Sequence, residues 1–182
     1  MEFLFDYPDR CVVGTVGQPG ERAFYLQVRQ GNRLCSVLLE KQQAEILALK
    51  LAELLDEARE NGDTLVPMDS ASVVADIKPL DMPLSEEFRV MRMGISWEPT
   101  SGRAWVEAAS YEDDEESDDS ELALESLHHT LRIALNADYA REFIRRTMAV
   151  VSAGRRACPI CEQPMHPSGH ICPRANGYHR LG

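Results

Sequence analysis

The sequence predicts an α+β fold of two similar halves, each an antiparallel sheet followed by a helix, packed pseudo-symmetrically and followed by a C-terminal zinc knuckle. Three observations lead to this prediction: short apolar stretches precede a long helical pattern, this order occurs twice, and cysteines and histidines cluster near the end. The predicted segments are a first half (1–60), a crossover (61–87), a second half (88–153) and a zinc-binding tail (154–182).

In the first half, turn residues separate short apolar stretches, which is typical of an antiparallel meander. The stretches surround Phe3–Phe5, Cys11–Val16, Ala23–Val28 and Leu34–Leu39. From Lys41 to Glu60 there is no glycine or proline, and apolar residues recur at the spacing of one helical face. We therefore expect a helix that Gly62 ends.

The second half repeats the order of strands followed by a helix. Strands are expected at Phe88–Trp97 and Arg103–Ser110, on either side of the turn EPTSGR, and at His129–Leu135. Asn136 is a good N-cap residue for a second helix that runs through Ser152.

The two halves also match in detail, which predicts an internal repeat. Val13-Gly14 corresponds to Met93-Gly94, and Leu39, Ala44 and Leu47 correspond to Leu135, Ala140 and Phe143. Each sheet would expose an apolar face alone, so pairing the halves into one core is the economical solution. The alternative is two unrelated α+β segments that share only generic patterning.

Two segments depart from this pattern. The crossover contains Pro67, Pro79 and Pro83 and is expected to be ordered, with at most a short strand or helical turn. Residues 112–121 (EDDEESDDSE) carry eight carboxylates, which repel one another and bury nothing. We expect a mobile, solubilising loop there, with an acidic docking segment as the alternative.

Composition predicts a soluble, cytoplasmic protein. The chain has 182 residues, 44% of them hydrophobic, and no apolar run of the roughly 18 residues needed to span a membrane. The first residues, MEFLFDYPDR, do not have the pattern of a secretory leader. The net charge of −11 repels phosphate backbones and argues against nucleic-acid binding. Only the mildly cationic tail favours such binding.

The tail holds the clearest motif of the chain. Cys158 and Cys161 form a CxxC pair, and Cys172 follows within reach of the same cation. Three thiolates and one histidine would fill the tetrahedral shell of zinc and leave no position for a substrate, so the site is predicted to be structural. His170 is the preferred fourth ligand, with His166 and His179 as alternatives.

Other candidate residues carry weaker signals. A redox role for the CxxC pair is disfavoured because prolines follow where a thioredoxin-like helix would begin. Cys11 and Cys35 are expected to be buried without chemistry. No nucleophile–base pattern or phosphate loop stands out, so an enzyme is not favoured. A polar cluster after the knuckle could bind a phosphate or carboxylate, or hold the tail on the body: Arg174, Asn176, Tyr178, His179 and Arg180.

At MEFLFDYPDR, VGQPGERAFYLQ and CPICEQPMHPSGHICPRANGYHR the sequence resembles a family of uncharacterised actinobacterial proteins, DUF3090. The resemblance extends over essentially the full chain and supports His170 over His166 as ligand. Genes of this family tend to lie beside those of a protein related to phosphatidylinositol 3- and 4-kinases and of a histidine-phosphatase-like protein. The tail pattern matches at Cys158, Cys161, His170, Cys172, Pro173, Arg174 and Asn176.

These observations leave three hypotheses for function. The preferred one is a non-catalytic binding or adaptor protein that works with the kinase-like and phosphatase-like partners implied by the resemblance. The second is an enzyme or small-ligand-binding protein with a pocket between the halves and the cluster around Arg174 at its rim. The third is nucleic-acid binding through the tail. A homo-oligomer is compatible with all three, because a second subunit could cover sheet edges.

Overall fold

The computed structural model describes residues 1–18, 20–63, 65–66, 74–111, 127–154, 158–161, 165, 172 and 174, and only the backbone of Tyr111, Leu127 and His128. The acidic run 112–121 therefore lies outside the described residues. The α+β class is confirmed. The elements are β1 (Glu2–Phe5), β2 (Arg10–Val16), β3 (Ala23–Gln30), β4 (Arg33–Leu39), α1 (Lys41–Glu60), β5 (Phe88–Arg89), β6 (Arg92–Glu98), β7 (Arg103–Tyr111), β8 (Leu127–Asn136) and α2 (Ala137–Ser152).

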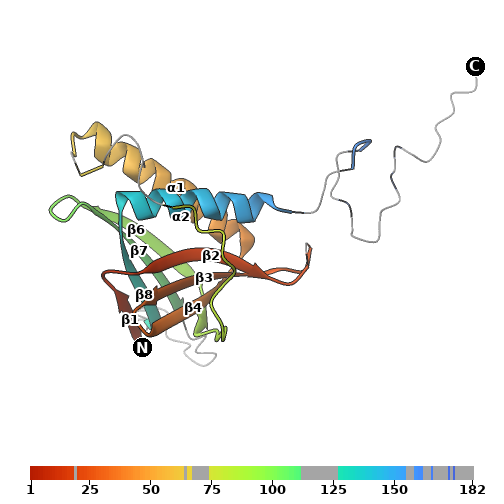
Figure 1. Ribbon diagram of the computed structural model, residues 1–182, viewed down its shortest axis with the longest axis horizontal. Coiled ribbons are helices and arrows are strands. Elements are labelled where there is room, and N and C mark those ends of the chain that lie inside the picture. The colour runs from red at the N-terminus through yellow and green to blue at the C-terminus, as the bar shows by residue number, and fades with distance from the viewer. Residues whose placement is uncertain are drawn as a thin grey trace, which may run out of the picture.

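The strands form two four-stranded sheets, in the orders β1-β8-β7-β6 and β2-β3-β4-β5 (Figure 1). Each sheet contains three consecutive antiparallel strands and one parallel strand from the other half of the chain. β1 pairs in parallel with β8, and β5 pairs in parallel with β4. The antiparallel meander predicted in the first half is confirmed for β2, β3 and β4, but the prediction that Phe3–Phe5 belongs to it is wrong.

The prediction of one strand at Phe88–Trp97 is also wrong, because this segment forms two strands, β5 and β6, in different sheets. The Val90 N–H donates to the Leu38 carbonyl in one sheet, and the next N–H, that of Met91, donates to the Ala109 carbonyl in the other. The chain thus passes between the sheets within two residues. The alternation of apolar residues changes phase at this point, from Phe88 and Val90 to Met93, Ile95 and Trp97, with the adjacent pair Val90-Met91 at the break.

The exchanged strands pair at matching positions relative to the helices. Phe5 of β1 lies opposite Ile133, three residues before the N-cap Asn136, and Phe88 of β5 lies opposite Val37, three residues before the N-cap Glu40. Each helix also packs on a strand from the other half of the chain, since α1 contacts β6 and α2 contacts β2. Topology is thus equivalent in the two halves, while their pseudo-symmetric packing stays a prediction.

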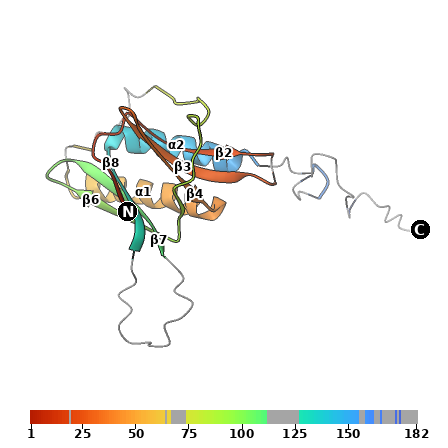
Figure 2. The ribbon, with the colours of Figure 1, turned by 90° about the horizontal axis from the view of Figure 1, so that it is seen from below.

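The core lies between the inner faces of the sheets and the two helices, which lie side by side in both views (Figure 1, Figure 2). Asn136 caps α2, as predicted, because its Oδ1 accepts a bond from the Tyr139 N–H at 2.9 Å. Each helix buries one stripe at the expected spacing. The stripes include Ala44, Leu47, Leu51 and Leu55 of α1 and Ala140, Phe143, Thr147 and Val151 of α2. Neither described helix is long and apolar enough to cross a membrane.

Residues 74–83, which we call the strap, cross the outer face of the sheet formed by β2, β3 and β4 (Figure 1). Leu80 rests on Gly14, where an added Cβ would lie 2.5 Å from Leu80 Cδ2. Because the strap covers this face, five successive residues of β2, beginning at Arg10, are buried instead of every second one.

Candidate functional site

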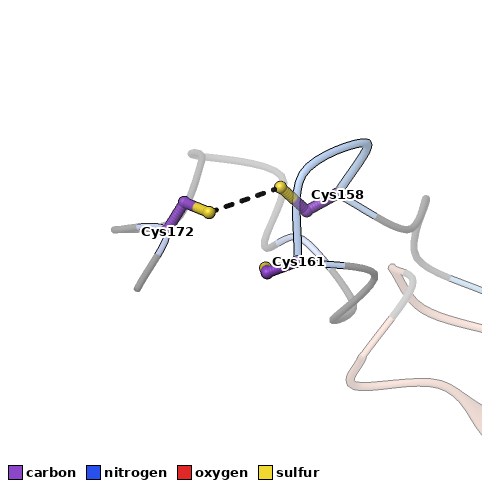
Figure 3. A group of neighbouring side chains, drawn as sticks. All are labelled: Cys158, Cys161 and Cys172. Carbon is purple, nitrogen blue, oxygen red and sulfur yellow. Dashed lines mark hydrogen bonds between the residues drawn. The ribbon is translucent and has the colours of Figure 1, made fainter. Parts of the chain in front are cut away.

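The three tail cysteines come together as predicted. The Sγ atoms of Cys158, Cys161 and Cys172 lie within 4.8 Å of one another, and those of Cys158 and Cys172 are 3.9 Å apart (Figure 3). Two thiolates bound to one zinc ion at ~2.3 Å in a tetrahedron would be about 3.8 Å apart. The observed spacing suits a shared metal, and all three thiols are free of disulfides.

The turn that carries the CxxC pair prepares its first thiol for metal binding. The backbone N–H of Cys161 and then that of Ile160 donate to the Cys158 sulfur and lower the pKa of this thiol to about 6, although desolvation opposes them. The thiolate is the form that binds metal. Cys158 and Cys172 are buried and Cys161 is half-buried, which shields the sulfurs from water.

The donor set determines which metals fit. Thiolate sulfur favours zinc, copper(I) or iron–sulfur centres over the hard cations calcium and magnesium. Cys158, Cys161 and Cys172 can hold such an ion together with one further ligand. The three candidates for this ligand, His166, His170 and His179, lie outside the described residues.

One member of the predicted polar cluster is described, and it contacts the knuckle. Arg174 Nη1 donates to the Ile160 carbonyl at 3.3 Å and so links the Cys172 limb of the site to the CxxC turn. This contact positions the two limbs relative to each other. The other residues of the predicted anion site, Asn176, His179 and Arg180, fall outside the part of the chain that the structure describes.

A second polar site, which the sequence did not reveal, ties the strap to both halves. Asp76 of the strap accepts bonds from Arg10 of β2 (Nε to Oδ2, 2.6 Å) and from Arg146 of α2 (Nη1 to Oδ1, 2.9 Å). Both arginines are at most 7% exposed and also donate to the Lys78 carbonyl. The bond from Arg10 is the main cause that lowers the pKa of Asp76.

A cavity of about 460 Å³ lies beside this cluster, between β2, the strap and the first turns of α2. Residues of both halves line it, but Arg174 is not among them. The signal missed in the sequence is Arg146, a charged residue three positions after Phe143 on the apolar stripe of α2. An arginine in such a place must find buried partners.

Cys11 and Cys35 are buried in their strands, as expected. Burial raises the pKa of each thiol to about 12, so both remain protonated at neutral pH. Buried, protonated thiols of this kind act as small apolar side chains.

Comparison with known proteins places the chain in a family. No curated protein and no solved structure matches it significantly. The model of a family described as "Protein of unknown function (DUF3090)" matches residues 3–172, a span that contains both halves and ends at the third cysteine of the knuckle. The chain therefore belongs to the DUF3090 family.

Proposed function

We propose that this protein is a non-catalytic binding protein whose tail is folded around a structural zinc ion. The observation that carries the proposal is the convergence of three thiols within 4.8 Å. A fourth ligand, for which we propose His170, would complete a closed tetrahedral shell. Such a shell orders a short segment that has too little apolar area to fold unaided. Free thiols of this kind suit the reducing cytoplasm, where we place the protein.

Metal analysis tests the zinc site. Mass spectrometry of protein purified without added zinc should find one zinc ion per chain. His170→Ala should lose this ion, whereas the matched variant His166→Ala should keep it. A metal-free wild-type chain, or a chain that forms a disulfide between Cys158 and Cys161, would contradict the proposal.

We further propose that the body binds a protein partner, of the kinase-like and histidine-phosphatase-like classes implied by the family resemblance. The strap supports this proposal because it exposes three large apolar side chains, Val74 at 88%, Ile77 at 87% and Met82 at 76%. They stand on a segment that buried polar contacts hold in place. A preorganised apolar surface is a favourable place for a partner to bind.

Co-purification tests the partner and its location together. The tagged chain should retain one of the two neighbouring gene products at physiological salt. Ile77→Asp should abolish retention, whereas Ile46→Asp, at a half-exposed position of α1, should leave it unchanged. If the wild-type chain retains neither protein, the partner proposal is wrong while the zinc proposal stands.

A further inference from the structure

The four sheet edges of the molecule are protected to different degrees. An edge strand carries backbone N–H and C=O groups that another chain can pair with, and folded proteins usually protect such strands. The strand orders place β1 and β6 at the edges of one sheet, and β2 and β5 at the edges of the other. In the described part of the chain, three of these edges are protected and β6 is the exception.

The protected edges are either bonded by an arginine or very short. Arg146 Nε donates to the Val13 carbonyl of β2 at 3.1 Å. Arg33 Nη2 donates to the Leu4 carbonyl of β1 at 2.9 Å. β5 has two residues, which is too short to guide the pairing of another strand.

β6 is a strand of seven residues whose edge lacks such protection. Among the described residues, no side chain bonds to the backbone of Met93–Glu98. In the predicted repeat, the α1 residue that matches Arg146 is Lys50, and its Nζ donates to Glu53 of the same helix at 2.6 Å instead of reaching β6. An edge of this length and character is a place where a further strand can add to the sheet.

The sequence of β6, RMGISWE, has the same chemical character when it is read from either end. Each side of Ile95 carries a small, then an apolar, then a charged residue: Gly94, Met93 and Arg92 on one side, and Ser96, Trp97 and Glu98 on the other. In two copies paired antiparallel about a two-fold axis at Ile95, Arg92 of each copy faces Glu98 of the other. Met93 likewise faces Trp97. Cross-strand pairs of opposite charge and of apolar side chains both stabilise a sheet.

The burial of the apolar side chains also favours a second strand at this edge. Met93, Ile95 and Trp97 pack on the core but are only half-buried. On the protected edge strand β2, the inner residues Cys11 and Val13 are buried. A second copy of β6 would cover the open side of its apolar residues and remove further apolar surface from water.

We propose that β6 pairs antiparallel with β6 of a second copy of this chain, so that two four-stranded sheets become one continuous sheet. The interface is isologous, because each copy offers the same strand across a two-fold axis. Backbone hydrogen bonds supply the affinity, and the charges at the ends of β6 select the register. The surface lies on the sheet that the strap does not cross, so the dimer is independent of the zinc site and of the partner surface proposed above.

The end residues of β6 can make these contacts alongside those within their own chain. Both Arg92 and Glu98 are exposed. Ser101 and Trp105 donate to Oε2 of Glu98, and the second carboxylate oxygen, Oε1, is the acceptor for the arginine across the axis. A guanidinium has five N–H donors, so Arg92 can serve an acceptor of its own chain and one of the second copy.

Sedimentation velocity of the full chain over a dilution series tests the dimer. At about 0.1 mM the species should have twice the chain mass of 20.4 kDa. Arg92→Glu and Glu98→Arg should each weaken the dimer by about tenfold or more, because two like-charge pairs replace two ion pairs. A wild-type chain that is monomeric at this concentration would overturn the proposal.

Mixing the two charge variants tests the register. An equimolar mixture of Arg92→Glu and Glu98→Arg should form a heterodimer about as tight as wild type, because the reversed charges then face opposite ones. Glu107→Arg, the same reversal on the neighbouring strand β7, is the matched control and should stay dimeric. The proposal is wrong if both single variants remain dimeric, or if they are folded by circular dichroism and their mixture stays monomeric.

Discussion

The outer faces of the two sheets differ far more than their inner faces. On the sheet β2-β3-β4-β5 the strap covers Arg10 and Gln27, which are buried and form hydrogen bonds with strap residues. On the sheet β1-β8-β7-β6 the corresponding charged contact, Arg132 with Glu107 at 2.8 Å, has side chains 41% and 47% exposed. One sheet thus buries polar groups on its outer face, and the other leaves them in water.

The inner and outer faces of the two sheets are under different physical constraints. Their inner faces both form the core, and the residues opposite Phe5 and Phe88 of the exchanged strands, Ile133 and Val37, are apolar and fully buried. The outer faces are free of that constraint. Buried polar contacts are costly unless they are satisfied, so the polar groups on the covered face of the first sheet depend on specific partners in the strap.

The largest expected effects fall on the shared core. Phe143→Ala should lower the free energy of unfolding by about 3–5 kcal/mol and Leu47→Ala by about 2–5 kcal/mol, since each leaves a cavity in the stripe between the helices. Urea unfolding followed by tryptophan fluorescence measures both losses. Ile46→Ala, at a half-exposed neighbour, should change stability by only about 0.5 kcal/mol. A large loss in one helix but not in the other would break the equivalence of the inner faces.

The next effect separates the outer faces. Asp76→Ala leaves Arg10 and Arg146 buried without their shared carboxylate and should cost about 3–5 kcal/mol. Glu107→Ala removes an exposed partner and should cost at most about 1 kcal/mol. Paired urea titrations compare the two variants. Similar losses would show that burial of the charges makes no difference.

Gly14 and Gly94, which the predicted repeat matches, give a finer test. A Cβ at Gly14 would collide with Leu80, whereas a Cβ at Gly94 would find its nearest neighbour, Glu107, at 3.9 Å. Gly14→Ala should therefore cost about 1–3 kcal/mol through displacement of the strap. Gly94→Ala should stay within about 0.5 kcal/mol of wild type. Thermal unfolding of the two variants distinguishes them, and the comparison fails if Gly14→Ala is neutral.

The smallest effect is a dependence on pH. The pKa of Asp76 is lowered in the folded protein, so its contribution to stability is fully present above the unfolded value of about 4 and is lost as the pH falls through the folded value. Asp76→Asn has no carboxylate to protonate, so it should lack this part of the loss of stability at acid pH. Stability measured from pH 6 down to pH 2 should therefore fall less steeply in the variant. Parallel curves would contradict the role of Asp76.

The sequence predicted the parts of the fold that depend on local patterns. The bounds of α1, Lys41–Glu60, followed from a run without glycine or proline, and the cap at Asn136 followed from its side-chain chemistry. The cysteine cluster was predictable because its spacing is part of the metal-binding chemistry. Each of these signals lies within a short stretch of chain.

The remaining features depend on residues that are far apart in the chain. Nothing in Glu2–Phe5 indicates that its partner strand lies beyond residue 126. Arg10, Asp76 and Arg146 are separated by at least 66 positions, and a single arginine gives no indication of its partners. Both the exchange of β1 and β5 and the arginine cluster therefore required the three-dimensional arrangement.

The exchanged strands have a consequence for how the chain folds as it is made. β1 is synthesised before the other described elements, and its strand partner within the described residues, β8, ends at Asn136. Until β8 has been synthesised, Phe3 and Phe5 cannot take their places in the sheet. Contacts between such distant segments slow folding and leave apolar side chains exposed meanwhile. The first half therefore completes neither sheet during synthesis, because one sheet needs β5 and the other needs β8.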